Sequence, residues 1–292
     1  MGYSDSFENL ARGLPNPRRG WAGQLKWKAD PLGEYRWIDL DGLLSKVADA
    51  IWIYGDGGRT NSRQLLVPHW KTCLAIIRKW DPEKTGITEV QIVALGPVKT
   101  PRWNHAGETS EIIAVRLHPE AVEPIIGLRP LDLVDQDVMV QPRFDFDPVR
   151  RPAESGATAE QVALALIQYL AKSRAAIQFP HSKASLAAAF IRQSQGQARI
   201  SHLAKTLDVP MRSFRRAFEQ NVGLAPKHYA RNVRLMKFLL RADEFERPNW
   251  SAFAQDFGYF DQAHMIQDIT SLAGVGPAQL HRSRRYSGGT AP

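Results

Sequence analysis

The chain has 292 residues, 43% of them hydrophobic and 23% charged, which is enough for two ordinary globular domains. Its apolar runs fall short of the roughly 18 residues of a membrane span, and residues 1–16 lack the apolar core of a signal peptide. The one cysteine, Cys73, excludes an internal disulfide and a zinc site of clustered thiolates. We therefore expect a cytoplasmic protein. Much of the net charge of +8 lies in residues 196–292, which hold 14 Lys and Arg against 8 Asp and Glu. This positive charge would attract a polyphosphate partner, or it could serve only to keep the protein soluble.

The first half of the chain is predicted to be rich in β-strands. Residues 1–34 are rich in Gly, Pro, Arg and Asn and are expected to form a loose lead-in. Over residues 35–141, short apolar runs with many β-branched side chains alternate with turn residues; examples are 50–54, 89–95 and 111–117. Short strands at this spacing favour a sandwich or a barrel-like domain.

A helical region is predicted to follow. Residues 142–158 have the proline and charge content of a linker, and residues 159–182 return to helical spacing as a connecting helix. An all-helical domain is expected over residues 183–285, followed by a flexible tail over residues 286–292. The predicted fold class is therefore α+β, with a β-rich N-terminal domain and an all-α C-terminal domain.

The most specific pattern in the helical region is a tandem repeat. Residues 200–218 and 250–269 each contain a short helix with alanine on its inner face, a tight turn and a second helix. Each copy closes with Gly-x-x-Pro, at Gly223 and at Gly274. Two helices joined by such a turn make a helix-turn-helix, whose second helix can lie in a DNA major groove. A long helix predicted over residues 226–241 would span roughly 24 Å and hold the two copies apart.

Motif residues in both copies, and in the helix between them, carry a family resemblance. They are Leu203, Ala204, Arg212 to Phe218, Gly223, Pro226, Tyr229, Arg234, Leu235, Phe253, Ala254, Phe257 to Tyr259, Asp261, Gln262, His264, Gly274 and Pro277. Residues 184–282 thereby resemble the DNA-binding domain of the AraC/XylS family of bacterial transcription regulators. Residues 35–140 are similar, more loosely, to the β-rich domain of one branch of that family.

The resemblance implies a sequence-specific DNA-binding regulator that is not an enzyme and needs no cofactor. In the wider family, the N-terminal domain senses a ligand, dimerises or does both. The expected partner is a double-stranded DNA operator. RNA polymerase, a small-molecule effector and a second copy of the chain are further candidates.

In this family the exposed face of each second helix reads bases. In the first copy that face carries Arg212, Arg215 and Arg216, opposite two phenylalanines. An arginine can donate two hydrogen bonds to guanine O6 and N7, or bind a phosphate, so the first copy is expected to anchor the domain on DNA. The alternative is a solvated face with Glu219 as an intrahelical partner.

The second copy departs from the family pattern, because no Lys or Arg lies between Phe260 and Leu272. Its uncharged outward side chains could read adenine or touch a thymine methyl group, or the copy could be purely structural. Asp268 would repel phosphate unless it faces the protein. The outward residues predicted to contact bases are Gln262, Ala263, Ile266 and Gln267.

Four basic residues near the two copies are predicted to contact phosphates. Arg234 could instead pack within the domain. The four residues are Lys205, Lys227, Arg231 and Arg234.

Two other interpretations stay open at this point. One is a helical protein-interaction module that has lost DNA binding. The other is a β-barrel metal-dependent enzyme with a helical docking domain, although the histidine spacing is unlike that of a ligand pair on a strand, and no metal site is predicted. Cys73 lies in an apolar run and is expected to be a buried small residue. The residues that such an enzyme would use are His69, His105 and His118, with Glu108 and Glu111.

Overall fold

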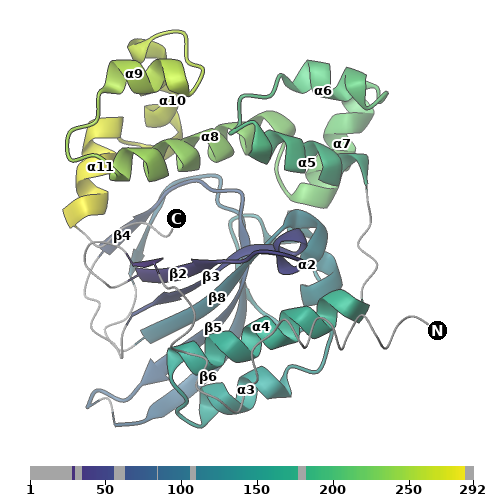
Figure 1. Ribbon diagram of the computed structural model, residues 1–292, viewed down its shortest axis with the longest axis vertical. Coiled ribbons are helices and arrows are strands. Elements are labelled where there is room, and N and C mark those ends of the chain that lie inside the picture. Colours follow the sequence, from purple (N-terminus) through teal and green to yellow (C-terminus); the bar gives the residue numbers. More distant parts are fainter. Residues whose placement is uncertain are drawn as a thin grey trace.

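The computed structural model describes residues 28–29, 35–55, 63–83, 85–105, 110–176 and 182–286. Most of the predicted lead-in, all but the first residue of the predicted tail, and Glu108 lie outside these residues. An antiparallel sheet with helices on one face forms the N-terminal part, and the C-terminal part is helical (Figure 1). This arrangement confirms the predicted fold class.

The N-terminal part is built on one antiparallel sheet of seven strands, in the order β1-β2-β3-β8-β5-β6-β9. The interior strand β5 pairs with β6 and with β8, which places Ile76 between Ile92 and Ile113. β-branched residues favour such pairing because they pack well on a pleated surface. A separate ribbon pairs β4 with β7. The strands are β1 (Lys28–Ala29), β2 (Tyr35–Asp39), β3 (Ala48–Tyr54), β4 (Arg63–Leu66), β5 (Thr72–Trp80), β6 (Ile87–Leu95), β7 (Arg102–His105), β8 (Ser110–Leu117) and β9 (Asp137–Met139).

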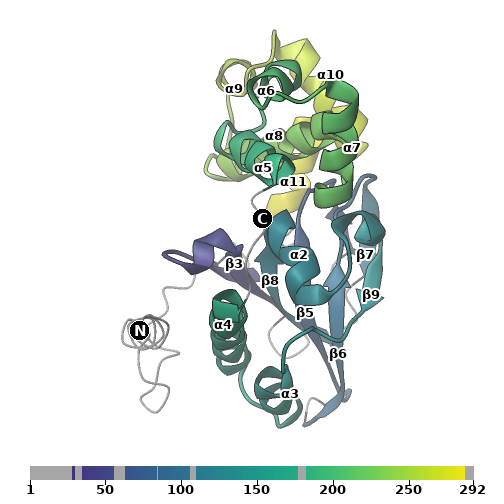
Figure 2. The ribbon, with the colours of Figure 1, turned by 90° about the vertical axis from the view of Figure 1, so that its right-hand side faces the viewer.

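Helices cover one face of this sheet (Figure 2). Ile76 and Ile113 join Val162 and Leu166 in one buried cluster on that face, and a smaller cluster around Trp52 lies on the other. The sequence suggested a sandwich or a barrel. In the described residues the strands form one open sheet, with a short ribbon beside it, and helices take the place of a second large sheet. These helices are α2 (Pro119–Ile126), α3 (Asp147–Glu154) and α4 (Ala159–Ala176), with short 3-10 turns η2 (Leu44–Lys46) and η3 (Pro130–Leu133).

The composition of residues 142–158 suggested a loose linker. In the structure they contain the helix α3 instead. Proline in the first turn of a helix removes no hydrogen bond, and Val149 is fully buried in the cluster on the sheet. The buried guanidinium of Arg78 binds the carbonyl oxygen of Ala157 and the carboxylate of Glu111. The helix α4 also packs on the sheet, so this segment belongs to the N-terminal core.

The C-terminal part contains two helix-turn-helix motifs joined by a long helix, as predicted (Figure 1). The helices α6 and α7 form the first motif, α9 and α10 form the second, and α8 joins them. Gly223 (φ 87°) and Gly274 (φ 74°) end α7 and α10 in the left-handed conformation that glycine adopts without strain. The helices are α5 (Lys183–Gln193), α6 (Ile200–Thr206), α7 (Met211–Val222), α8 (Pro226–Asp243), α9 (Trp250–Asp256), α10 (Gln262–Ala273) and α11 (Pro277–Tyr286).

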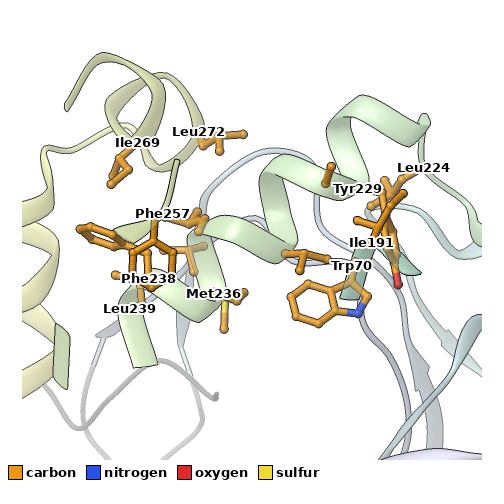
Figure 3. Packing of buried hydrophobic residues seen from close by; sticks show 14 of the residues in the cluster. Trp70, Ile191, Leu224, Tyr229, Met236, Phe238, Leu239, Phe257, Ile269 and Leu272 are labelled. Atoms are coloured by element: carbon orange, nitrogen blue, oxygen red, sulfur yellow. The ribbon is translucent and has the colours of Figure 1, made fainter. Parts of the chain in front are cut away.

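A single buried cluster runs through both motifs and along α8 (Figure 3). Phe218 of α7 packs against Tyr229 of α8, with ring centroids 5.4 Å apart. Towards the other end of α8, the ring of Phe238 lies 5.6 Å from that of Phe257, which follows α9. The two motifs are therefore held on one rod by aromatic contacts. None of the described helices is both long and apolar enough to cross a membrane.

The N-terminal and helical parts share a buried contact. Trp70 of the N-terminal part belongs to the helical cluster and meets Tyr229 edge to face, with ring centroids 6.1 Å apart (Figure 3). At Gly223, an added Cβ would lie 2.7 Å from the carbonyl oxygen of Pro130, so α7 ends directly against the N-terminal part. The positions of α7 and α8 are thus fixed relative to the sheet.

We expect acid to destabilise the protein through His69, the neighbour of Trp70. Burial and the positive charges of Lys71 and Arg102 lower the pKa of His69 from 6.5 to about 3. Below pH 6.5 the unfolded chain takes up a proton at His69 that the folded chain does not. The free energy of unfolding therefore decreases as the pH is lowered. In His69→Asn, which keeps an acceptor for the backbone N–H of Lys71, urea unfolding should show a smaller loss between pH 7 and pH 5. Equal losses in the two proteins would contradict this.

Candidate nucleic-acid interface

The helix α7 of the first motif has an apolar and a basic face. In the turn before it, Asp208 adopts the left-handed conformation (φ 49°), and α7 begins at Met211. Phe214 and Phe218 lie one helical turn apart and are both buried. Their burial fixes which side of α7 faces the core and leaves the opposite side in solvent.

Arg212, Arg215 and Arg216 are all exposed on α7. Of the three, only Arg215 pairs with an acidic side chain in the described part of the chain. Its partner is Glu219, one turn further on, at 3.1 Å, with 68% of the Arg215 side chain exposed. An exposed pair contributes less than about 1 kcal/mol, so Arg215 can exchange Glu219 for a phosphate or a base. The basic face is therefore available to an anionic partner.

The helix α10 of the second motif is also fixed by its apolar face. Met265 and Ile269 are buried, whereas Gln262, Ala263, Ile266 and Gln267 are exposed. The side chain of Asp261 caps the helix by accepting a hydrogen bond from the backbone N–H of His264 at 2.7 Å. The four predicted contact residues therefore share an outward face that carries no charge.

Asp268 faces the protein rather than solvent, which removes the repulsion expected of it. Its carboxylate accepts hydrogen bonds from Arg231 Nε at 2.8 Å and from the Tyr259 hydroxyl at 3.1 Å. Burial and the charge of Asp268 raise the pKa of Tyr259. Arg231 also donates to the hydroxyl of Ser271. Arg231, predicted as a phosphate contact, therefore joins α8 to α10 instead, because its guanidinium is already bonded.

Arg234 packs within the domain as well. Its guanidinium donates to the carbonyl oxygen of Gly196 at 3.0 Å and lies 5.0 Å from the centre of the Tyr259 ring. This is the alternative that the sequence left open for Arg234. The other two predicted phosphate contacts, Lys205 and Lys227, are exposed. Of the four candidates, these two keep a geometry suited to phosphate.

The residue that the sequence-based assignment missed is Phe260. It lies in the turn before α10, and 91% of it is exposed. The available signal was the length of the second turn, which is longer than the first by one residue.

The helices α7 and α10 lie on the same side of α8 (Figure 2). The 18 residues of α8 span roughly 27 Å. Successive major-groove segments on one face of DNA are about 34–36 Å apart, and two helices that project from the ends of such a rod can approach that separation.

Residues 203–283, which include α7, α8 and α10, match a family model described as a helix-turn-helix domain. Residues 203–283 form an AraC/XylS-type domain. A domain of this type is the DNA-binding part of transcription regulators of the AraC type. The AraC/XylS-type domain thus contains both exposed helix faces described above.

The residues named for a metal-dependent enzyme make other contacts in the structure. Glu111 is paired with Arg78, and His118 lies 2.9 Å from the carbonyl oxygen of Ser45. Burial raises the pKa of the Cys73 thiol to about 11, so the thiol is a poor nucleophile. The described residues include no group of three His, Cys, Asp or Glu side chains placed to hold a metal ion; the side chain of His105 lies outside this description.

Several solved structures are similar to the chain. The C-terminal domain of AraT, a response regulator from Geobacillus stearothermophilus, is 24% identical over 37% of this chain and 90% of its own, with a TM-score of 0.33. ToxT from Vibrio cholerae O395 is 9% identical over 85% and 97%, with a TM-score of 0.41. ToxT from Vibrio cholerae strain SCE256 bound to an unsaturated fatty acid is 8% identical over 76% and 91%, with a TM-score of 0.40. No curated protein matches the chain.

Proposed function

We propose that the protein regulates transcription by binding a specific operator with both recognition helices. The helices α7 and α10 would enter successive major grooves on one face of the duplex. The helix α7 would supply most of the affinity and α10 would add specificity. The cluster of three exposed arginines on α7 carries this proposal, because a planar guanidinium donates to guanine O6 and N7 together.

Lys205 and Lys227 would contact phosphates beside the α7 groove. Both are exposed. Phosphate contacts fix the register of a protein on DNA without selecting a sequence, and each releases counterions that make binding salt-dependent.

The N-terminal part would control DNA binding through its contact with the helical domain. Arg192 of α5 lies 3.7 Å from Glu120 of α2, and the end of α7 packs against η3 at Pro130. A cavity of about 440 Å³ lies at this contact and is lined by residues of both parts, including Glu120 and Asn221. A small-molecule effector bound in this cavity would touch both parts at once. A second copy of the chain or RNA polymerase would be a further partner of the regulatory complex.

Selection of bound sequences from random duplex DNA tests this function. We expect an enriched site with two half-sites about 10 base pairs apart, centre to centre. Repeating the selection with candidate effectors tests the control by the N-terminal part. A protein-interaction module that has lost DNA binding would enrich no sequence, and a purely structural second motif would enrich one half-site only.

A further inference from the structure

The two motifs differ in the turn that precedes the recognition helix. Asp208 (φ 49°) and Gly258 (φ 69°) occupy the same left-handed position in their turns. Two residues separate Asp208 from the start of α7, whereas three separate Gly258 from the start of α10. The second turn therefore contains one additional residue, next to the end of the helix that a groove would receive.

Phe260 is the residue that protrudes from this turn. Its neighbour Tyr259 is buried, and the hydroxyl of Tyr259 is held by Asp268. Its other neighbour, Asp261, caps α10. Phe260 itself is 91% exposed, more than any other large hydrophobic residue described. Its ring therefore adds nothing to the packing of the domain.

Two exposed apolar residues on α10 follow Phe260, which lies directly before the first turn of the helix and donates its backbone N–H to His264 Nδ1 at 3.4 Å. Ala263 and Ile266 are both exposed. They lie three residues apart on α10 and therefore share one side of the helix. We call Phe260, Ala263 and Ile266 the apolar face of α10. This face includes two of the four predicted base contacts of the second motif, and α10 lies on the same side of α8 as α7 (Figure 2).

The charges around α10 do not favour phosphate. The helix contains no Lys or Arg, and the positive end of its dipole is occupied by the carboxylate of Asp261. A major groove also offers apolar surface, the C5-methyl group of thymine, and phenylalanine is among the side chains that contact it. The apolar face therefore suits the methyl group of thymine, which a protein can contact without a positive charge.

We propose that Phe260 is a specificity-determining residue that contacts a thymine methyl group in the second half-site. This inference rests on the proposed function, because α10 must enter a major groove. Ala263 and Ile266 extend the same contact along the groove, and Gln262 and Gln267 border it. The second motif then selects A·T pairs by apolar contact, and the first motif selects by the arginines of α7.

The test compares Phe260→Ala with wild type on the selected duplex, and on the same duplex with the second half-site thymines replaced by deoxyuridine. Loss of the ring is expected to weaken binding about tenfold, about 1.4 kcal/mol. Deoxyuridine should weaken the wild type similarly and the variant little further. The salt dependence should stay unchanged, because no ion contact is lost. Phe190→Ala, at a half-exposed position on α5, is the matched control and should bind as wild type does.

The possible outcomes separate this inference from the proposed function. If the wild type selects no sequence, the proposed function fails. If the wild type is selective and Phe260→Ala binds equally well, only the inference about Phe260 is overturned. A variant that keeps full DNA affinity and loses transcription activation also overturns it, because the apolar face would then serve a protein partner. Unchanged thermal unfolding of the variant excludes a folding defect.

Discussion

Replacing Arg212, Arg215 and Arg216 together by alanine is expected to lower the affinity for the selected duplex by at least about 100-fold. A bidentate arginine–guanine contact contributes about 1–3 kcal/mol of discrimination, and each phosphate contact adds to counterion release. The fold should survive, because all three side chains are exposed and Phe214 and Phe218 hold α7 from the opposite side. Binding is measured by fluorescence anisotropy over a range of salt concentrations.

A triple lysine variant separates base reading from simple charge. Lysine keeps the positive charge of Arg212, Arg215 and Arg216 but loses the planar fork that binds guanine at two points. We expect this variant to bind unrelated DNA about as well as the wild type and to lose its preference for the selected site. For the triple alanine variant, Arg150→Ala with Arg151→Ala, at two exposed positions on α3, is the control for the loss of positive charge away from α7. Full affinity in the triple alanine variant would refute the role of these arginines.

Phe238→Ala is expected to lower the free energy of unfolding by about 3–5 kcal/mol, the usual cost of removing a buried aromatic ring. Phe238 is fully buried in α8. Its ring centre lies 5.6 Å from that of Phe257 (Figure 3). It also lies 5.6 Å from that of Phe253 and 5.8 Å from that of Trp250. These contacts hold the second motif on α8, so the cavity left by alanine would loosen α9 and α10 in particular.

Urea unfolding followed by tryptophan fluorescence measures this loss, because Trp250 reports on the same cluster. The control is Phe245→Ala, at a position near the end of α8 where 38% of the residue is exposed. We expect its loss to be well below that of Phe238→Ala. A loss below 1 kcal/mol for Phe238→Ala would contradict the view that this ring joins the second motif to α8.

The helical domain could be predicted from the sequence because its signals are local. The glycines at 223 and 274 end helices through their own backbone conformation, and the following prolines start the next helices. The predicted long helix over residues 226–241 ends within two residues of α8. The exposed faces of α7 and α10 follow from the spacing of the buried residues on the same helices.

The rest depends on contacts between distant parts of the chain. The order of the strands joins β3 to β8, and composition does not encode such pairing. The linker composition of residues 142–158 did not show that Val149 would meet the sheet. An arginine is equally suited to a phosphate or a carboxylate, so only the position of Asp268, 37 residues away, shows that Arg231 is bonded within the domain. The exposure of Phe260 likewise follows from the turn geometry.

The most direct test of the reading by α7 replaces single guanines of the selected site by 7-deazaguanine, which lacks the N7 acceptor. If Arg212, Arg215 and Arg216 donate to guanine, the wild type should lose affinity at guanines of one half-site, by about 1–3 kcal/mol at each contacted base. The triple alanine variant should be insensitive to the same replacements. Wild-type affinity that does not change at any guanine, or an equal loss in both proteins, would contradict base recognition by α7.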